Sequence, residues 1–255
     1  MGCIPERKLQ IPCLPLKFRC TMMNLEEMSE ILKSSLGIRD NIVGVRLFKS
    51  EEEIPQDLKI VERPFRYCSM IQGARKEGRS FLARAEQHAC KGGASGLGMV
   101  PCPENIASGA LYFEKLHKCE TPDIGINMAT NMPRLLPGST VATYVAPLDK
   151  MVTNPDVVIF VGSPLQARRI VQAVMFTRGG RATFNTAGIQ SFCVDATSSP
   201  YLKGEVNVSL GCDGSARNSG LEDKDVVVGI PFAMMESICN VLRDNYAEWD
   251  RFMRG

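Results

Sequence analysis

The amino-acid sequence predicts a single α+β (mixed α/β) domain in which a mixed sheet is flanked by helices. The chain has 255 residues, of which 44% are hydrophobic and 23% are charged, the profile of a globular protein that buries one substantial core. Helix-like and strand-like segments alternate irregularly, without a strict strand–helix–strand repeat. We expect an N-terminal extension over residues 1–22 and the domain over residues 23–255.

The first part of the domain begins with a helix and a strand. Asn24 is a suitable N-cap for a helix that starts at Leu25. Apolar residues alternate over residues 41–48, which predicts a half-buried strand. The pattern then predicts three further segments: a helix over residues 65–76, a short strand over 80–83 and another helix over 105–116.

The second part contains two well-marked helix starts. Thr121 with Pro122, and Ser163 with Pro164, each combine an N-cap with a proline at the first helical position. The first of these helices should reach residue 132, and the second should end at Gly179 or Gly180. The buried face that we expect on the second helix consists of Leu165, Val171, Val174 and Met175.

Four more strands and a last helix complete the fold. The strands are predicted over residues 140–145, 157–161, 206–210 and 226–228. The last helix should start at Pro231, and it carries an apolar stripe that includes Cys239, for which we expect a core position. The full stripe is Phe232, Met235, Cys239, Leu242, Tyr246 and Trp249.

Composition restricts the compartment and the partners. The net charge is +2, so no strong field favours nucleic acid or an acidic membrane surface, and no apolar run reaches the length of about 18 residues that a membrane span needs. A secreted disulfide scaffold would be shorter and denser in cysteine than a chain with ten. Ten cysteines and thirteen methionines are oxidisable, which favours a reducing cytoplasm in an anaerobic organism.

Four cysteines in turn-like surroundings form the candidate site: Cys68, Cys90, Cys193 and Cys212. Cys68 falls in the first turn of a predicted helix, whose partial positive charge stabilises a thiolate. Three of the four lie within a few residues of glycine, so a bulky inorganic group could approach them. The alternative is that all four are ordinary buried cysteines.

The spacing of these cysteines favours an iron–sulfur cluster over zinc. Structural zinc usually takes its ligands as close pairs, whereas the nearest two here are 19 positions apart and the chain has no CxxC. Dispersed thiolates assembled by the fold are compatible with a [4Fe-4S] cluster, which is larger than one ion. Cys102 and His88 are the candidates to replace or supplement a ligand.

A different chemistry is suggested by the proximity of His88 and Cys90 in sequence. These two could form a nucleophile–base pair in a cofactor-free thiol enzyme, although such pairs are usually assembled from distant positions. The other interpretation of His88 is a hydrogen-bonding residue that orders the Cys90 segment. The glycine-rich segment 92–98 matches no phosphate-loop pattern, and its simpler role is to let the backbone pass close to a cofactor.

Eight short strings, among them the surroundings of Cys68, Cys90 and Cys212, resemble the family known as domain of unknown function 169, which occurs in archaea and anaerobic bacteria. The similarity covers roughly residues 25–243. It implies a role for Cys68, Cys90, Cys193 and Cys212, but no established reaction, and Cys102 departs from the family pattern. The family's arginine is expected where Ala216 stands, and Arg217 is its neighbour. The strings that carry the resemblance are residues 66–68, 88–94, 97–98, 146–148, 156–158, 200–202, 210–215 and 228–231.

The leading hypothesis is an iron–sulfur protein of anaerobic metabolism. The four cysteines would bind a [4Fe-4S] cluster, and the segment from Gly92 and Gly93 to Gly98 would cover it. His88 and Arg217 would lie beside the cluster, where Arg217 could hold a carboxylate or phosphate. The protein would transfer electrons with a redox partner or bind a small anionic ligand. The alternatives are the Cys90–His88 thiol enzyme and a non-catalytic interaction protein whose cysteines are structural.

Overall fold

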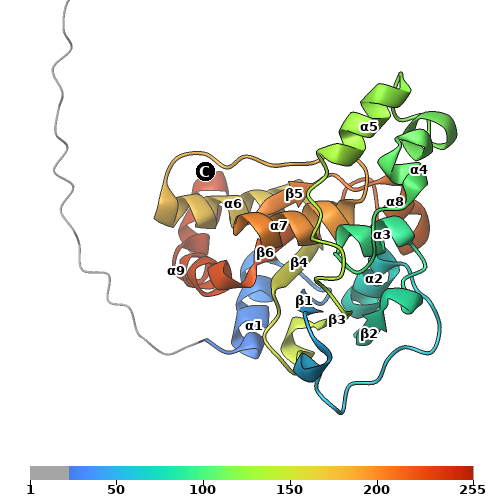
Figure 1. The fold of residues 1–255 in the computed structure, drawn as a ribbon. Helices are drawn as coiled ribbons and strands as arrows, with labels where there is room; N and C mark the ends of the chain where they lie inside the picture. Colours follow the sequence, from blue (N-terminus) through green and yellow to red (C-terminus); the bar gives the residue numbers. More distant parts are fainter. Residues whose placement is uncertain (1–22, 255) are drawn as a thin grey trace, which may run out of the picture.

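The computed structural model describes residues 23–254, so the expected N-terminal extension, with Cys3, Cys13 and Cys20, lies outside the described residues. Six strands form one sheet in the order β2-β3-β1-β4-β6-β5, and each of the six predicted strands overlaps one of them (Figure 1). The strands are β1 (Val43–Phe48), β2 (Phe81–Arg84), β3 (Ala142–Pro147), β4 (Val157–Gly162), β5 (Asn207–Ser209) and β6 (Val226–Pro231).

All five pairings between these strands are antiparallel. The sequence predicted a mixed sheet, with both parallel and antiparallel pairs. Parallel pairing occurs only in two isolated bridges of the described residues, Ile60 with Leu82 and Phe65 with His88. Helices cover the sheet without the crossover pattern of a parallel fold, which confirms the α+β class of a single domain.

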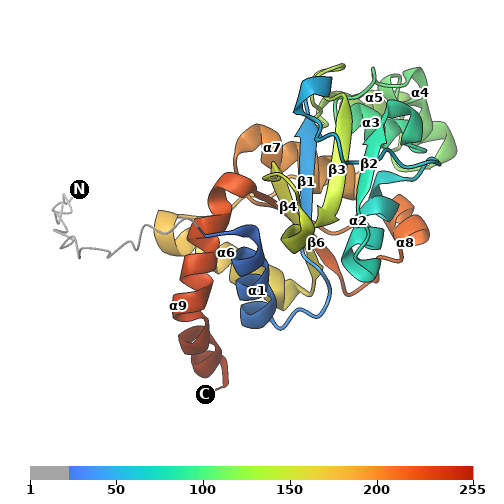
Figure 2. The ribbon, with the colours of Figure 1, turned by 90° about the horizontal axis from the view of Figure 1, so that it is seen from below.

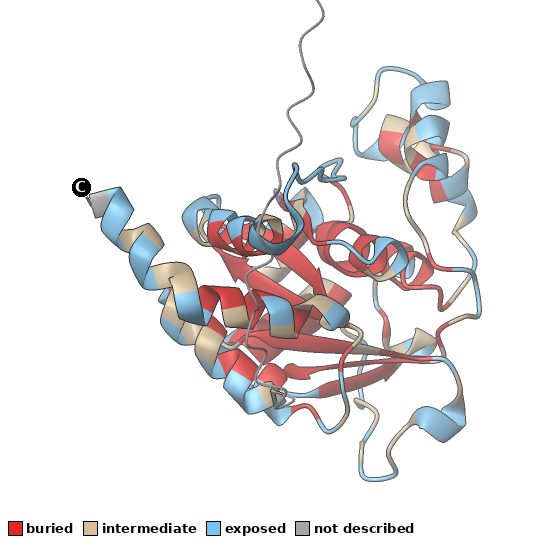
Figure 3. Ribbon diagram, turned by 90° about the vertical axis from the view of Figure 1, so that its left-hand side faces the viewer, coloured by how far each residue is buried: buried red, intermediate tan, exposed pale blue. Residues whose placement is uncertain are grey.

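Helices lie on both faces of the sheet, as Figure 2 shows. On one face, α1 (Leu25–Leu36), α6 (Pro164–Arg178) and α9 (Met235–Arg254) pack against apolar residues of β4 and β6. On the other face, α2 (Tyr67–Glu77), α3 (Lys91–Gly96) and a π-helix, Ser191–Ser198, pack against β1, β3 and β4. The strands are therefore buried, while exposed residues gather on the outer sides of the helices (Figure 3).

Local signals predicted the starts of three helices correctly. Asn24 and Ser163 each form a capping box with a residue three positions later, and the Thr121 side chain accepts the N–H of Ile124. Pro122 and Pro164 stand at the start of α5 (Pro122–Thr130) and α6. Of the stripe predicted on the last helix, Met235, Cys239 and Leu242 are buried in the core, and Phe232, Tyr246 and Trp249 are partly buried against it.

Three predicted details are wrong. Residues 105–116 are not one helix: α4 (Glu104–Ala107) ends before Gly109, whose φ of 75° turns the chain into a short π-helix, Leu111–Lys115. Pro231 closes β6, so α9 starts at Met235 after a 3₁₀ turn. Leu165 is half exposed and Val171 is only partly buried, whereas Val174, as predicted, is buried together with Ala167, Ile170 and Ala173.

The remaining helices, α7 (Ser199–Lys203) and α8 (Asp213–Ser219), follow the π-helix and β5 in the chain. Within the described part of the chain, residues 23–254, none of the helices combines the length and the apolar character that crossing a membrane requires.

Candidate four-cysteine site

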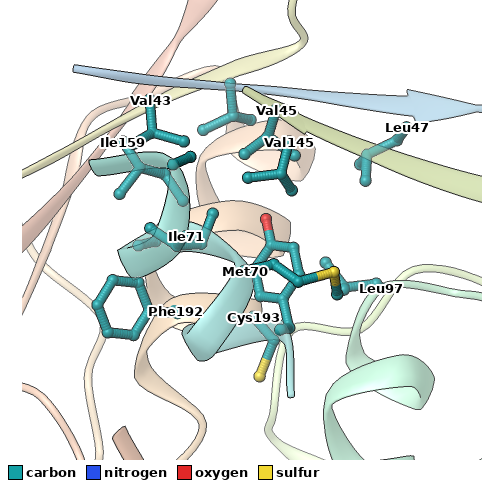
Figure 4. Close-up of a cluster of buried hydrophobic side chains, with 14 of the residues drawn as sticks. Val43, Val45, Leu47, Met70, Ile71, Leu97, Val145, Ile159, Phe192 and Cys193 are labelled. Carbon is teal, nitrogen blue, oxygen red and sulfur yellow. The ribbon is translucent and has the colours of Figure 1, made fainter. Parts of the chain in front are cut away.

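One cavity of about 370 Å³ is lined by all four cysteines that the sequence singled out. We call it the cysteine cavity. Cys68, Cys90, Cys193 and Cys212 reach it from four segments that are far apart in the sequence and that meet beside the apolar cluster under β1, β3 and β4. In Figure 4, Cys193 lies at the edge of that cluster with its sulfur on the side away from β1.

Three of the cysteines begin a helix. Cys68 is the second residue of α2, so its place in a first turn is as predicted. Cys90 is the N-cap of α3, and Cys212 is the N-cap of α8. Cys193 is the third residue of the π-helix, an uncommon structure that is frequent at functional sites and that the sequence analysis did not foresee.

Backbone and side-chain donors point at two of the sulfurs. The Gly93 N–H donates to Cys90 Sγ at 3.4 Å, and the Ser215 N–H donates to Cys212 Sγ at 3.3 Å. The Ser191 hydroxyl donates to Cys212 Sγ at 3.4 Å. Burial opposes ionisation of Cys212, but these hydrogen bonds from Ser191 and Ser215 outweigh it and lower the pKa of this thiol.

Cys68 and Cys193 behave in the opposite way. Burial, and then the nearby Cys212 and Cys90, raise the pKa of Cys68 to about 11. Burial, and then the three other cysteines, raise the pKa of Cys193 well above its usual value. The sulfurs are therefore close enough to influence one another, and they would need a positively charged centre to hold them together as thiolates.

The glycine-rich segment is not the covering loop that we expected. Its residues 91–96 form α3, because Cys90 caps the helix and the glycines allow close packing. Gly92 and Gly93 do line the cavity. A Cβ at Gly93 would lie 3.7 Å from both Cys90 Sγ and Cys193 Sγ, and a Cβ at Gly96 would lie 2.7 Å from Val194. Glycine thus brings α3 against the π-helix and the sulfurs.

The π-helix is held in place by β6 and by Gln190. A Cβ at Gly229 of β6 would lie 2.1 Å from the carbonyl oxygen of Ala196, so only glycine fits under the π-helix. Gln190, which precedes the π-helix, has a left-handed backbone with φ of 51°, and its side-chain amide donates to the Gly92 carbonyl at 2.5 Å. It connects the segments of Cys90 and Cys193.

His88 does not line the cavity. It is 1% exposed, its Nε2 lies 3.0 Å from Thr143 Oγ1, and its ring stacks on Tyr67. Burial, and then Lys91, lower the pKa of His88 to about 4. The ring is thus neutral near pH 7, and its Nε2 joins the segment before Cys90 to Thr143 of β3 rather than lining the cavity, as the cluster hypothesis had expected of His88.

The mouth of the cavity carries more cations than anions. Arg66, Lys118 and Arg217 are exposed lining residues, and Asp213 is the lining carboxylate among the described residues. Lys118 pairs with Asp213 at 2.5 Å, which leaves the two arginines in excess. Arg217 thus lines the same cavity as Cys212. Apolar side chains of the segment between α3 and α5 complete the wall: Ile106, Leu111, Tyr112 and Leu116.

The other cysteine considered as a ligand lies elsewhere. Cys102 belongs to a separate apolar cluster around Ile106 and Tyr112, and it is not a lining residue of the cavity. In the described residues 23–254, no three His, Cys, Asp or Glu side chains are placed to hold a metal ion. The four sulfurs surround a space rather than a single point, so the arrangement does not resemble a preformed zinc site.

Three residues that act on the site were not predicted from the sequence: Ser191, Ser215 and Gln190. One signal was available for Ser215: it follows Cys212 by three residues, the spacing of a capping box. Ser191 and Gln190 carried no such signal, because their roles depend on the π-helix and on contacts with segments about 21 and 98 residues away.

Comparisons with known proteins agree with the resemblance seen in the sequence. The chain is 34% identical over 226 residues to an uncharacterised protein of Methanocaldococcus jannaschii, a match that covers 88% of this chain and 96% of that protein. No solved structure matches. Residues 31–241 match the family model described as uncharacterised ArCR. The chain therefore belongs to the family known as domain of unknown function 169.

Proposed function

We propose that this protein binds a [4Fe-4S] cluster through Cys68, Cys90, Cys193 and Cys212. The observation that carries the proposal is the convergence of four cysteines, from four separate segments, on the cysteine cavity. A cluster bound there would supply one-electron transfer, or would bind a ligand if one iron kept an open position. The free thiols of the described residues fit a reducing cytoplasm, where such clusters persist.

The surroundings of the sulfurs support this donor set. Hydrogen bonds from Gly93 and Ser215 to the sulfurs of Cys90 and Cys212 are the interactions that stabilise ligating thiolates. The wall of the cavity is largely apolar, which limits water around a bound cluster. Thiols that were buried only as small apolar groups would have no reason to meet at one cavity, whereas ligands of one cluster must.

The charge at the mouth suggests what approaches the cluster. Arg66 and Arg217 favour a small anionic ligand or an acidic surface of a redox partner protein. Guanidinium groups can bind a carboxylate or a phosphate through two parallel hydrogen bonds. Such a ligand would bind at the mouth of the cavity, which both arginines line together with Cys212.

The rival functions have less support. A Cys90–His88 thiol enzyme needs the imidazole to face the thiol, but His88 Nε2 lies against Thr143 and the ring stacks on Tyr67. A purely structural role for the cysteines fits Cys239, which fills the core between helices. It does not account for Cys90 and Cys212, which are only partly buried and line a cavity.

Substitution of single cysteines tests the proposal. After anaerobic reconstitution with iron and sulfide, Cys193→Ala should lose most of the visible absorption and the bound iron. Cys239→Ala is the matched control, because it also removes a buried sulfur but one outside the cavity, and it should retain both. Cys102→Ala controls for a cysteine near the cavity. Equal iron content in all three variants would refute the ligand assignment.

A further inference from the structure

The hydrogen bonds to the four sulfurs are unequal. Cys212 Sγ accepts the Ser215 N–H at 3.3 Å and the Ser191 hydroxyl at 3.4 Å. Cys90 Sγ accepts one backbone N–H, that of Gly93. The thiol of Cys193 donates to the Gln190 carbonyl at 3.6 Å, and the thiol of Cys212, when protonated, can donate to Ser215 Oγ at 3.4 Å. Cys212 is therefore the position where polar groups of the protein act most directly on a sulfur.

Ser191 is the side chain best placed to act on Cys212. Its hydroxyl is fully buried, so water does not compete for its proton, and its two neighbours are Cys212 Sγ and Ser215 Oγ at 3.1 Å. Ser215 Oγ already accepts the Cys212 N–H at 3.0 Å and can donate to the Cys212 carbonyl at 2.8 Å. A Cys212 thiolate would carry negative charge and no proton, which makes it the stronger acceptor for the Ser191 hydroxyl.

We propose that Ser191 is a positioning residue that raises the reduction potential of the cluster by donating a hydrogen bond to the Cys212 sulfur; this rests on the proposed function. Reduction adds one electron to the cluster, and part of that negative charge falls on the ligating sulfurs. A donor aimed at such a sulfur stabilises the reduced form more than the oxidised form, so it moves the potential to a more positive value.

The test compares Ser191→Ala with Ser95→Ala by anaerobic redox titration of the full-length protein, after iron and sulfide have been counted in each. Ser95 is the matched control, because its buried hydroxyl donates to the Gly92 carbonyl rather than to a sulfur. We expect the midpoint potential of Ser191→Ala to shift to a more negative value. The potential of Ser95→Ala should equal that of the wild type. Ser191→Thr, which keeps the hydroxyl, should restore the wild-type value.

The outcomes separate this inference from the proposed function. A wild-type protein that takes up no cluster refutes the function itself. A loaded Ser191→Ala protein with an unchanged potential refutes the role of Ser191 and leaves the function intact. If Ser191→Ala does not load, Ser191→Gly replaces it, since it also lacks the hydroxyl. Failure of both to load, beside a loaded wild type, would refute tuning and assign Ser191 to cluster assembly.

Discussion

Replacing Gly229 with alanine should dislodge the π-helix that carries Cys193. The added Cβ would lie 2.1 Å from the Ala196 carbonyl oxygen, about 0.9 Å inside the 3.0 Å limit that real Cβ contacts respect. The obstacle is backbone, so the π-helix must move as a unit. Overpacking of this kind costs about 1–3 kcal/mol, and we expect a value near 3 because no flexible side chain can yield.

Thermal unfolding gives the assay. For a chain of this size, about 3 kcal/mol corresponds to a fall in Tm of roughly 6–12 °C. Gly44→Ala is the matched control, because Gly44 is also a buried strand glycine, and a Cβ there would meet only the flexible side chain of Met151. It should change Tm by less than about 3 °C. Equal Tm values for the two variants would refute the role of Gly229 in seating the π-helix.

Three further predictions concern pH, charge and capping. His88 takes up a proton below about pH 6.5 in the unfolded chain but only below about pH 4 in the folded protein. As pH falls through this window, the free energy of unfolding of the wild type should therefore decrease by about 3 kcal/mol relative to that of His88→Gln. Urea unfolding at several pH values measures both proteins, and the same pH dependence for the two would contradict the prediction. If the protein binds the proposed cluster, replacing Arg66 and Arg217 together with glutamine should slow its reduction by dithionite, an anion, several-fold at low salt, and should speed its reduction by the methyl viologen cation radical. Stopped-flow absorption measures both rates, and equal effects on the two reductants would show that the arginines do not attract anions to the cavity. Ser163→Ala removes the capping box of α6 and should lower Tm by about 2–4 °C, and an unchanged Tm would show that tertiary packing alone fixes this helix start.

Features that depend on neighbouring residues were predictable from the sequence. Asn24, Thr121 and Ser163 cap helices through contacts three residues away, so a short string contains the whole interaction. The strands were predictable for the same reason, because alternating or continuous apolar runs are local patterns. Antiparallel pairing throughout was not, because the paired residues lie up to 116 positions apart in the chain, as Val43 and Ile159 do.

Features set by distant contacts were missed. Glycines at residues 92, 93 and 96 predicted a loop, but they form α3 because the helix must approach the π-helix closely. The π-helix packs on Gly229, more than 30 residues away in the chain, and no pattern within its own residues predicts a π-helix. The four cysteines were found because thiols with glycine neighbours are chemically conspicuous, whereas Ser191, an ordinary buried hydroxyl, became visible only beside Cys212.

The cluster content of the purified protein tests the central claim most directly. The full chain would be purified without oxygen, reconstituted, and examined by absorption together with counts of iron and acid-labile sulfide. The account predicts a brown protein with a broad band near about 400 nm and about four irons and four sulfides per chain. A folded, colourless protein that retains neither iron nor sulfide after reconstitution would contradict it.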